Sequence, residues 1–323
     1  MQTRRTRPVS DTHNDCDGIH KPEAHGKGFA RLFNRNLFTG TLLLPGRASG
    51  LHRIIVPRHR AAGLVIPFEH LMTERAEHGD NQPSRRPKLG VAVPLANEED
   101  TIHGFLDRVL AHLQSHDRIY CVLDNVCKDR TKSIVSERSA QDPRVVLVWS
   151  PQNRCVVDAY FAGYRAAFDD GCEWILEMDG GLSHLPEQIP AFLAGMEQGY
   201  DYVGGSRYLP GGCHKSPWSR IFVSKGGTVL ARRLLHAKMT DMTSGFECFN
   251  RRAMQMVLQA GVASKANFFQ TEIRWMMHQL RWLEVPIAYR NTNFLIGRSS
   301  IREAFRILWN LRRAENQKRR MAA

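Results

Sequence analysis

The sequence predicts an α/β fold in which a mostly parallel central sheet has helices on both faces. From Lys88 onward, short apolar runs alternate with segments whose apolar residues recur at helical spacing. The runs are apolar almost throughout, which is typical of strands buried on both faces of a parallel sheet. The chain has 323 residues, 42% of them apolar and 24% charged, so it is long enough to bury such a sheet.

The elements are expected in the order strand, helix, strand, strand, helix, strand. The first strand is LGVAVPL, and Asn97 is placed to cap a helix whose apolar face holds Ile102, Phe105, Leu106, Val109, Leu110 and Leu113. The strands IYCVLDN and VVLVWS follow, then a helix over residues 156–168 and the strand WILEMDG.

Polar residues follow three of these strands. In parallel sheets, ligands bind at the carboxyl ends of the strands, so Pro94 to Glu98, Asp124 with Asn125, and Asp179 are expected at one edge. An acid at a strand end is, taken alone, more often a turn or helix-cap residue. Three polar strand ends at one edge favour a binding site over three independent loops.

The net charge of +13 is carried by the two ends of the chain. Residues 91–297 hold 22 basic and 22 acidic side chains, whereas both flanking segments have a basic excess. This distribution favours an anionic surface contacted by the ends over nucleic-acid binding. The apolar runs are too short to cross a bilayer, and the N-terminus lacks the apolar core of a secretory signal, so a cytoplasmic protein is expected.

Six sequence blocks occur together and in a fixed order. They are VAVPLANEEDTI, VLDNVCKDRT, the long block YFAGYRAAFDDGCEWILEMDGGLSHLPEQIP, VGGSRYLPGG, DMTSGFECFNR and FFQTEIRWMMHQLRWLEVPIAYRN. In this order they resemble the family 2 glycosyltransferases, which have the GT-A (nucleotide-diphospho-sugar transferase) fold. Within that family they are most similar to the polyprenyl-phosphate, or dolichol-phosphate, mannosyl- and glucosyltransferases. The resemblance covers roughly residues 88–313.

The resemblance implies a donor site and a metal site. A nucleotide sugar, GDP- or UDP-hexose, would be bound by Pro94, Asn97, Glu98, Asp124 and Asn125. Asp179 would coordinate a divalent ion, Mg²⁺ or Mn²⁺, which screens the diphosphate as it leaves.

The resemblance also implies an acceptor site for polyprenyl phosphate. Arg207, Arg220 and Ser224 would hold its phosphate, with Arg207 and Asp179 as the catalytic pair. Asp241 and the TSGF segment that follows would shape this side by capping and packing. A phosphate monoester is already largely anionic at neutral pH, so it needs no general base. We therefore expect a single displacement that moves mannose or glucose with inversion of configuration.

The chain is expected to have three segments. Residues 1–87 show no sustained period and would be a flexible or irregular extension, with Met72 as an alternative start, and residues 88–297 would be the GT-A domain. Residues 298–323 would form a basic amphipathic helix and tail, with an apolar face made of Ile301, Ala304, Phe305, Leu308 and Leu311. This helix suits either the interface of an anionic membrane or packing on the domain, and the two are compatible. The expected location is peripheral, on the cytoplasmic face of a membrane.

Several positions depart from the family pattern. The metal motif is usually Asp-x-Asp, but Gly181 occupies the place of the second acid. His184 and Glu187 are nearby candidates, although His184 is better suited to packing and Glu187 to the first turn of a helix. Ala96 stands where the family often has an aromatic residue. The segment RCVVD at residues 154–158 replaces a glycine-rich turn, and Ser300 takes the place of a lysine.

Three other functions remain open from the sequence. One is a GT-A enzyme that uses a hydroxyl acceptor, which the lack of an obvious base disfavours. Another is a glycosyltransferase-like binding protein that has lost catalysis with the second acid. The third is a nucleic-acid-binding protein, which only the pI near 9.7 suggests.

Overall fold

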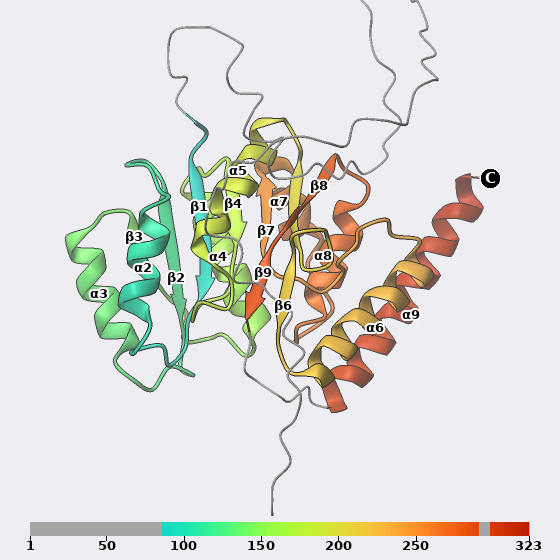
Figure 1. The fold of residues 1–323 in the computed structure, drawn as a ribbon, viewed down its shortest axis with the longest axis horizontal. Helices are drawn as coiled ribbons and strands as arrows, with labels where there is room; N and C mark the ends of the chain where they lie inside the picture. The colour runs from blue at the N-terminus through green and yellow to red at the C-terminus, as the bar shows by residue number, and fades with distance from the viewer. Residues whose placement is uncertain (1–85, 291–297, 323) are drawn as a thin grey trace, which may run out of the picture. The chain divides into compact units, whose positions relative to one another are not determined.

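The computed structural model describes residues 86–290 and 298–322 (Figure 1). The expected extension over residues 1–87 lies almost wholly outside these ranges, as does the alternative start at Met72. The end of the expected domain, residues 291–297, also lies outside them.

A seven-stranded sheet forms the centre of the described chain, in the order β3-β2-β1-β4-β7-β5-β8. Every neighbouring pair is parallel except those of β7, which runs antiparallel to both β4 and β5. The expected mostly parallel sheet is therefore confirmed. Its strands are β1 (Leu89–Pro94), β2 (Arg118–Leu123), β3 (Val145–Trp149), β4 (Trp174–Glu177), β5 (Tyr202–Ser206), β7 (Glu247–Asn250) and β8 (Trp282–Pro286).

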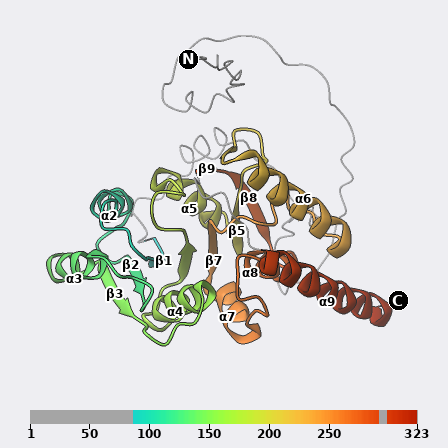
Figure 2. The same ribbon diagram turned by 90° about the horizontal axis from the view of Figure 1, so that it is seen from below.

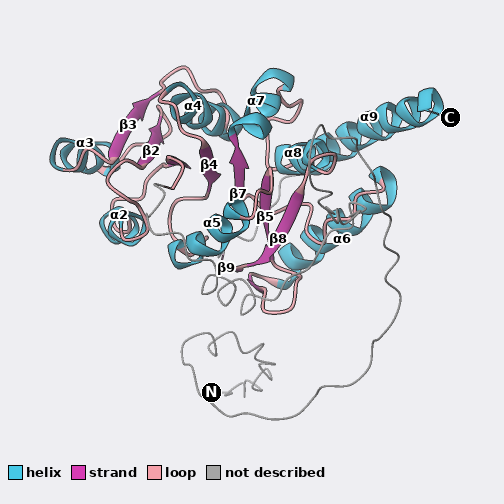
Figure 3. Ribbon diagram, turned by 90° about the horizontal axis from the view of Figure 1, so that it is seen from above, coloured by secondary structure: helices cyan, strands magenta, loops and turns pink. Residues whose placement is uncertain are grey.

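Helices cover both faces of this sheet, as expected (Figures 2 and 3). The buried side chains of α2 (Ile102–Leu110) and α5 (Ile189–Glu197) belong to the core on one face. Those of α4 (Val156–Asp169), α7 (Arg251–Ala260) and α8 (Phe269–Met277) belong to the core on the other. A short helix, η3 (Pro186–Gln188), precedes α5, and β6 (Cys213–Lys215) pairs with β9 (Ala288–Arg290) in a separate parallel ribbon.

The expectation that β2 leads directly into β3 is wrong, because α3 (Thr131–Gln141) connects them. Only Thr131 and Val135 of this helix are buried. It therefore lacks the apolar stripe by which a helix is recognised in a sequence. A parallel pair requires a crossover connection, so the parallel register of β2 and β3 is itself consistent with this helix.

Asn97 does not cap α2, contrary to expectation. The residue before the helix is Thr101, which makes no side-chain capping hydrogen bond. Asn97 has a left-handed backbone with φ of 57°. Its side-chain oxygen accepts from the backbone N–H of Lys128 at 2.8 Å, so it joins the loop after β1 to the loop after β2. Asparagine tolerates this backbone conformation better than most residues.

Two long helices, α6 (Trp218–Leu235) and α9 (Arg298–Ala322), run side by side at one end of the sheet (Figure 1). The Arg312 guanidinium joins them by donating to the carbonyl of Leu234 at 2.7 Å. Among the described side chains of α9, Ile307 and Leu308 are the buried apolar ones. Across the described residues, we find no helix that combines the length and the apolar character needed to cross a bilayer.

Gly163 sets how closely α4 approaches the sheet. A Cβ atom at this position would lie 3.0 Å from Cβ of Ala92 and 3.1 Å from Cγ2 of Val122. We expect Gly163→Ala to lower the free energy of unfolding by about 1–3 kcal/mol through overpacking. The control is Gly104→Ala in α2, where a Cβ would meet nothing within 4 Å and should stabilise the helix by about 1 kcal/mol. Urea unfolding measures both, and equal effects of the two substitutions would contradict the packing argument.

Candidate active site

The three polar strand ends predicted from the sequence start at one edge of the sheet. Strands β1, β2 and β4 are parallel neighbours, with Pro94 paired to Val122 and Ala92 paired to Glu177. The loops that follow them therefore leave the sheet on the same side. Nucleotide binding by Pro94, Asn97, Glu98, Asp124 and Asn125 stays a prediction that this shared edge makes geometrically reasonable.

Internal hydrogen bonds hold these loops. The Asp124 carboxylate accepts from the N–H of Val126 at 2.8 Å, and the Asn125 amide donates to the carbonyl of Pro151 at 2.9 Å. The first of these is the local bond by which Asp forms turns. Asp124 and Asn125 therefore shape the loop after β2 in addition to any contact with a ligand.

Asp179 is the best positioned acid of this edge. Its backbone N–H donates to Nδ1 of His184 at 3.0 Å, and the Tyr160 hydroxyl donates to its Oδ1. Its side chain remains 30% exposed. Burial lowers the pKa of His184, so this histidine is neutral at neutral pH and can accept with Nδ1. The carboxylate is thus fixed in place and still open to a ligand.

Neither candidate for the missing second acid can take that role. His184 is 1% exposed and stacks on Phe246 with ring centroids 4.8 Å apart, so it packs, as the sequence favours. Glu187, in the first turn of η3, forms a two-point ion pair with Arg108 at 2.7 and 2.6 Å. Within residues 86–290 and 298–322, no group of three or more His, Cys, Asp or Glu side chains could hold a metal ion.

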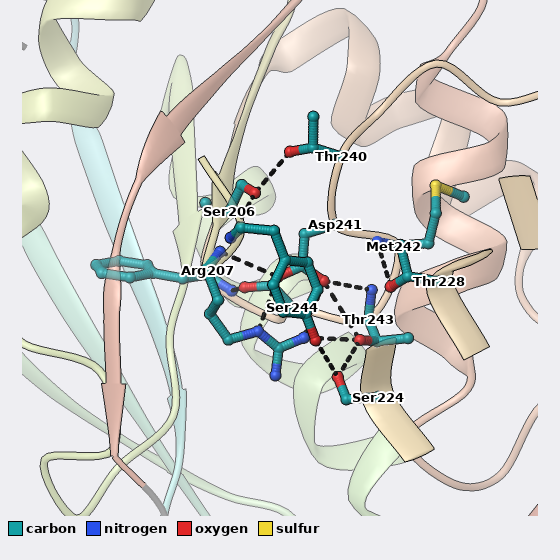
Figure 4. Close-up of polar contacts among 12 residues, drawn as sticks. Ser206, Arg207, Ser224, Thr228, Thr240, Asp241, Met242, Thr243 and Ser244 are labelled. Atoms are coloured by element: carbon teal, nitrogen blue, oxygen red, sulfur yellow. Dashed lines mark hydrogen bonds and ion pairs between the residues drawn. The ribbon is translucent and has the colours of Figure 1, made fainter. Parts of the chain in front are cut away.

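Arg207 follows β5 and is held by a buried ion pair (Figure 4). Its Nε and Nη2 donate to the two carboxylate oxygens of Asp241 at 2.7 and 2.8 Å, and Nη2 also donates to Thr243 at 2.6 Å. Burial would raise the pKa of Asp241, but the guanidinium outweighs it and holds this pKa well below its usual value. Asp241 is therefore ionised and fixes Arg207.

Ser224 extends this network to α6. Its hydroxyl lies 2.7 Å from that of Thr243, and the Tyr208 hydroxyl donates to it at 3.2 Å. The rings of Tyr208 and Tyr289 lie 5.5 and 5.4 Å from the Arg207 guanidinium. In the part of the chain that the structure describes, Nη1 of Arg207 makes no hydrogen bond, so it can still donate to a ligand.

A cavity of about 710 Å³ connects these groups with α6 and α9. We call it the acceptor groove. Asp179, Arg207, Arg220, Ser224 and Thr243 line its polar part. Its apolar part is lined by Val156, Phe222, Val223, Leu230, Phe268, Ile301, Ala304, Phe305 and Leu308. The structure therefore brings Asp179 together with the three residues expected to hold the acceptor phosphate.

Sequence reasoning assigned no role to Tyr160 or Tyr289, which line this groove. Tyr160 lies on α4, which reads as an ordinary amphipathic helix, and nothing in its pattern points to Asp179. Thr243 belongs to the TSGF segment that was expected, with Asp241, to shape the acceptor side, and it lines the groove.

Buried acids lie in the sheet beneath the site. Glu177 on β4 and Glu247 on β7 are opposite each other in the antiparallel register, and both are fully buried. Burial, together with the charge of Glu247, raises the pKa of Glu177 well above its usual value. Arg274 pairs with Glu247 at 2.7 Å, while the Tyr164 hydroxyl donates to Glu177. The protonated form of Glu177 is therefore favoured by its surroundings.

With this geometry in place, comparison with known proteins gives a clear result. The profile of Glycosyl transferase family 2 matches residues 90–258, which is more than half of the chain. The chain belongs to glycosyl transferase family 2. The resemblance noted in the sequence is thereby confirmed, and this protein is a glycosyltransferase.

Two relatives of this glycosyltransferase are similar along most of their length. Polyprenol monophosphomannose synthase of Mycolicibacterium smegmatis is 29% identical over 245 residues, which cover 72% of this chain and 92% of the relative. Undecaprenyl-phosphate mannosyltransferase of Micrococcus luteus is 30% identical over 200 residues, 61% of this chain and 81% of the relative.

Solved structures confirm the fold of this glycosyltransferase. Glucosyl-3-phosphoglycerate synthase from Mycobacterium tuberculosis, in complex with Mn²⁺, UDP and glucosyl-3-phosphoglycerate, matches with a TM-score of 0.51 and 15% identity. The match covers 70% of this chain and 80% of that one. A structure of the same synthase with Mg²⁺ and UDP matches with a TM-score of 0.50 and 14% identity, over 70% of this chain and 79% of that one. The expected GT-A fold is confirmed.

The buried acids predict opposite effects of two isosteric substitutions. The pKa of Glu177 is raised in the folded chain. Its contribution to the free energy of unfolding is therefore greatest below the pKa of the unfolded chain, near 4.5, and falls as the pH rises. Glu177→Gln should therefore match the wild type near pH 5 and be more stable at pH 8 by about 1 kcal/mol or more. Urea unfolding at both pH values measures this, and a destabilised Glu177→Gln at pH 8 would contradict it.

The matched control for this prediction is Glu247→Gln. This substitution removes the carboxylate that pairs with the fully buried Arg274. At pH 8 it should destabilise the protein by about 3 kcal/mol, because breaking one half of a buried ion pair leaves the other half uncompensated.

Proposed function

We propose that this glycosyltransferase transfers a hexose from a nucleotide sugar to the phosphate of a polyprenyl phosphate, inverting the configuration of the sugar. The observation that carries the proposal is the acceptor groove, whose apolar walls lead to Asp179, Arg207 and Arg220. An apolar groove that ends at cationic groups suits a long-chain lipid phosphate. The names of the two relatives, a polyprenol monophosphomannose synthase and an undecaprenyl-phosphate mannosyltransferase, support the same acceptor.

The arginines suit an acceptor that carries negative charge. Asp241 uses two donors of Arg207, which leaves Nη1 to bond a phosphate oxygen, and Arg220 also lines the groove. Among the described residues of the groove, Asp179 is the one carboxylate, and no histidine lines it. A hydroxyl acceptor would need a general base, whereas a phosphate monoester is already anionic. The groove therefore favours the lipid phosphate over a hydroxyl acceptor.

The proposed reaction is one displacement. An oxygen of the acceptor phosphate forms a bond to the anomeric carbon as the bond from that carbon to the diphosphate breaks, and the electron pair leaves with the nucleoside diphosphate. Arg207 and Arg220 orient the attacking phosphate, which removes much of the entropic barrier. A divalent cation held by Asp179 would offset the charge that develops on the leaving diphosphate. The synthase structures with Mn²⁺ or Mg²⁺ and UDP support such a cation.

The test is transfer of label from a panel of nucleotide sugars that includes GDP-mannose and UDP-glucose. We expect an extractable lipid-linked product with one of them and polyprenyl phosphate. Asp179→Asn should lower the rate of product formation by about 10²-fold or more, because the charge on the leaving diphosphate is then poorly stabilised. The control, Glu173→Gln, changes an exposed acid at the opposite end of β4. Full activity of Asp179→Asn would refute the role of Asp179, and transfer to hydroxyl acceptors alone would refute the acceptor.

A lipid acceptor also requires contact with a membrane, and α6 and α9 suit that contact. Seven of the ten exposed large apolar side chains in the described residues lie on these two helices: Trp218, Phe222, Val223, Val229, Ile301, Phe305 and Trp309. The helices also carry exposed basic side chains, among them Lys225, Arg232, Arg302 and Arg306. Apolar side chains that insert and basic ones that meet anionic headgroups are typical of interfacial helices. We infer peripheral binding to anionic membranes through this pair.

Vesicle co-sedimentation tests the membrane surface. The full chain should bind vesicles with anionic lipid more tightly than neutral ones. Trp218→Ala with Trp309→Ala should reduce binding by about tenfold or more, because both indoles are exposed and suit the headgroup region. Neither residue is among those that line the groove, so transfer to a short, water-soluble acceptor should persist. Trp149→Ala, at the other end of the sheet, is the matched control, and equal losses in both variants would contradict this surface.

A further inference from the structure

The loop after β4 carries Gly181 at the position of its missing second acid. Gly181 has a left-handed backbone with φ of 65°. A Cβ atom added to it would lie 2.7 Å from Oε1 and 2.8 Å from Oε2 of Glu98. The carboxylate of Glu98 therefore occupies the space in which a side chain at residue 181 would begin. An acid is present at this point of the loop, but it comes from the loop after β1.

Glu98 is held in this position by contacts with its own loop and with α3. Its backbone N–H donates to the hydroxyl of Thr131 at 2.7 Å. Its Oε2 accepts from the hydroxyl of Thr101 at 2.8 Å. Within the described chain, Oε1 makes no hydrogen bond, so one carboxylate oxygen stays available. The side chain is fixed in direction, as a metal ligand must be.

A second observation comes from the other side of Asp179. The Nε2 atom of His184 is buried and makes no hydrogen bond, and it lies 3.9 Å from Oδ2 of Asp179. Because Nδ1 accepts from the backbone N–H of Asp179, the proton of the ring lies on Nε2. A buried donor without a partner is costly, and a small shift of the Asp179 carboxylate would satisfy it. Oδ2 of Asp179 thus faces a buried polar atom that has no partner among the described residues.

We propose that Glu98 supplies the second carboxylate of the divalent-metal site, in place of the acid that Gly181 lacks. Asp179 and Glu98 fit Mg²⁺ or Mn²⁺, because such ions take carboxylate oxygens and Mg²⁺ is often bound by one or two carboxylates plus substrate phosphates and waters. The inference rests on the proposed function, which uses a cation at Asp179. It gives Glu98 a role different from the direct contact with the nucleotide sugar that the sequence led us to expect.

The glycine is part of this arrangement. With Glu98 in place, any side chain at residue 181 would meet its carboxylate oxygens at under 3 Å. Conversely, removal of the Glu98 carboxylate frees the space for an aspartate at residue 181, and Asp tolerates the left-handed backbone better than most residues. A carboxylate can therefore come from residue 98 or from residue 181. A side chain at residue 181 is accommodated only when the Glu98 carboxylate is removed.

The experiment measures binding of Mn²⁺ to the full chain in the presence of UDP or GDP, by the loss of the free-ion paramagnetic resonance signal. We expect Glu98→Ala and Glu98→Gln each to weaken Mn²⁺ binding by about tenfold or more. The double variant Glu98→Ala with Gly181→Asp should recover most of that loss. Glu99→Ala, which removes the neighbouring acid that pairs with Arg130, should bind Mn²⁺ like the wild type. Circular dichroism shows that each variant is folded.

Two outcomes would overturn the inference. One is wild-type Mn²⁺ affinity in both Glu98 variants, and the other is a double variant that binds no better than Glu98→Ala. Asp179→Ala separates this failure from that of the proposed function. If it loses Mn²⁺ while the Glu98 variants keep it, Glu98 is not the ligand but the cation at Asp179 stands. If the wild type binds no Mn²⁺ with either nucleotide, both the inference and the proposed cation are wrong.

Discussion

The buried guanidinium of Arg274 holds together the parts that carry the site. It pairs with Glu247 on β7 at 2.7 Å and donates to the carbonyls of Gly205, Ser244 and Asp241. These carbonyls belong to the end of β5 and to the loop after α6, so one side chain from α8 fixes both. The loop in turn supplies the Asp241 carboxylate that binds Arg207. The position of the acceptor arginine therefore depends on a charge that is itself fully buried.

That dependence explains why the acids around Arg274 differ in protonation. Asp241 stays ionised because Arg207 and Arg274 both favour its charge. Burial raises the pKa of Glu247 to about 7, although Arg274 opposes the shift. Burial and the charge of Glu247 both raise the pKa of Glu177 well above its usual value. Burial alone disfavours every one of these charges, and the positive charge of a nearby arginine favours it. The guanidinium of Arg207 is thus fixed at the site, while burial favours the protonated carboxyl of Glu177 in the sheet.

The sequence predicts the strands and their shared edge well, because buried strands have a strong apolar signal. It fails for α3, whose buried residues are only Thr131 and Val135, and for Asn97, whose partners lie in another loop. The groove residues Arg207, Arg220 and Ser224 were predicted through the resemblance. Contacts between distant segments, such as Tyr160 with Asp179 or Glu98 with Gly181, have no local pattern, so only the structure brings them into view.

The position of Asp179 has a consequence for the order of events after transfer. This residue lines the acceptor groove, whereas Glu98, Asp124 and Asn125 lie in the loops at the edge of the sheet and are not among the groove's lining residues. Under the proposed function, the two products would leave by different exits. The lipid-linked sugar would move sideways from between α6 and α9, and the nucleoside diphosphate would return to water across the sheet edge. Neither departure would need to wait for the other.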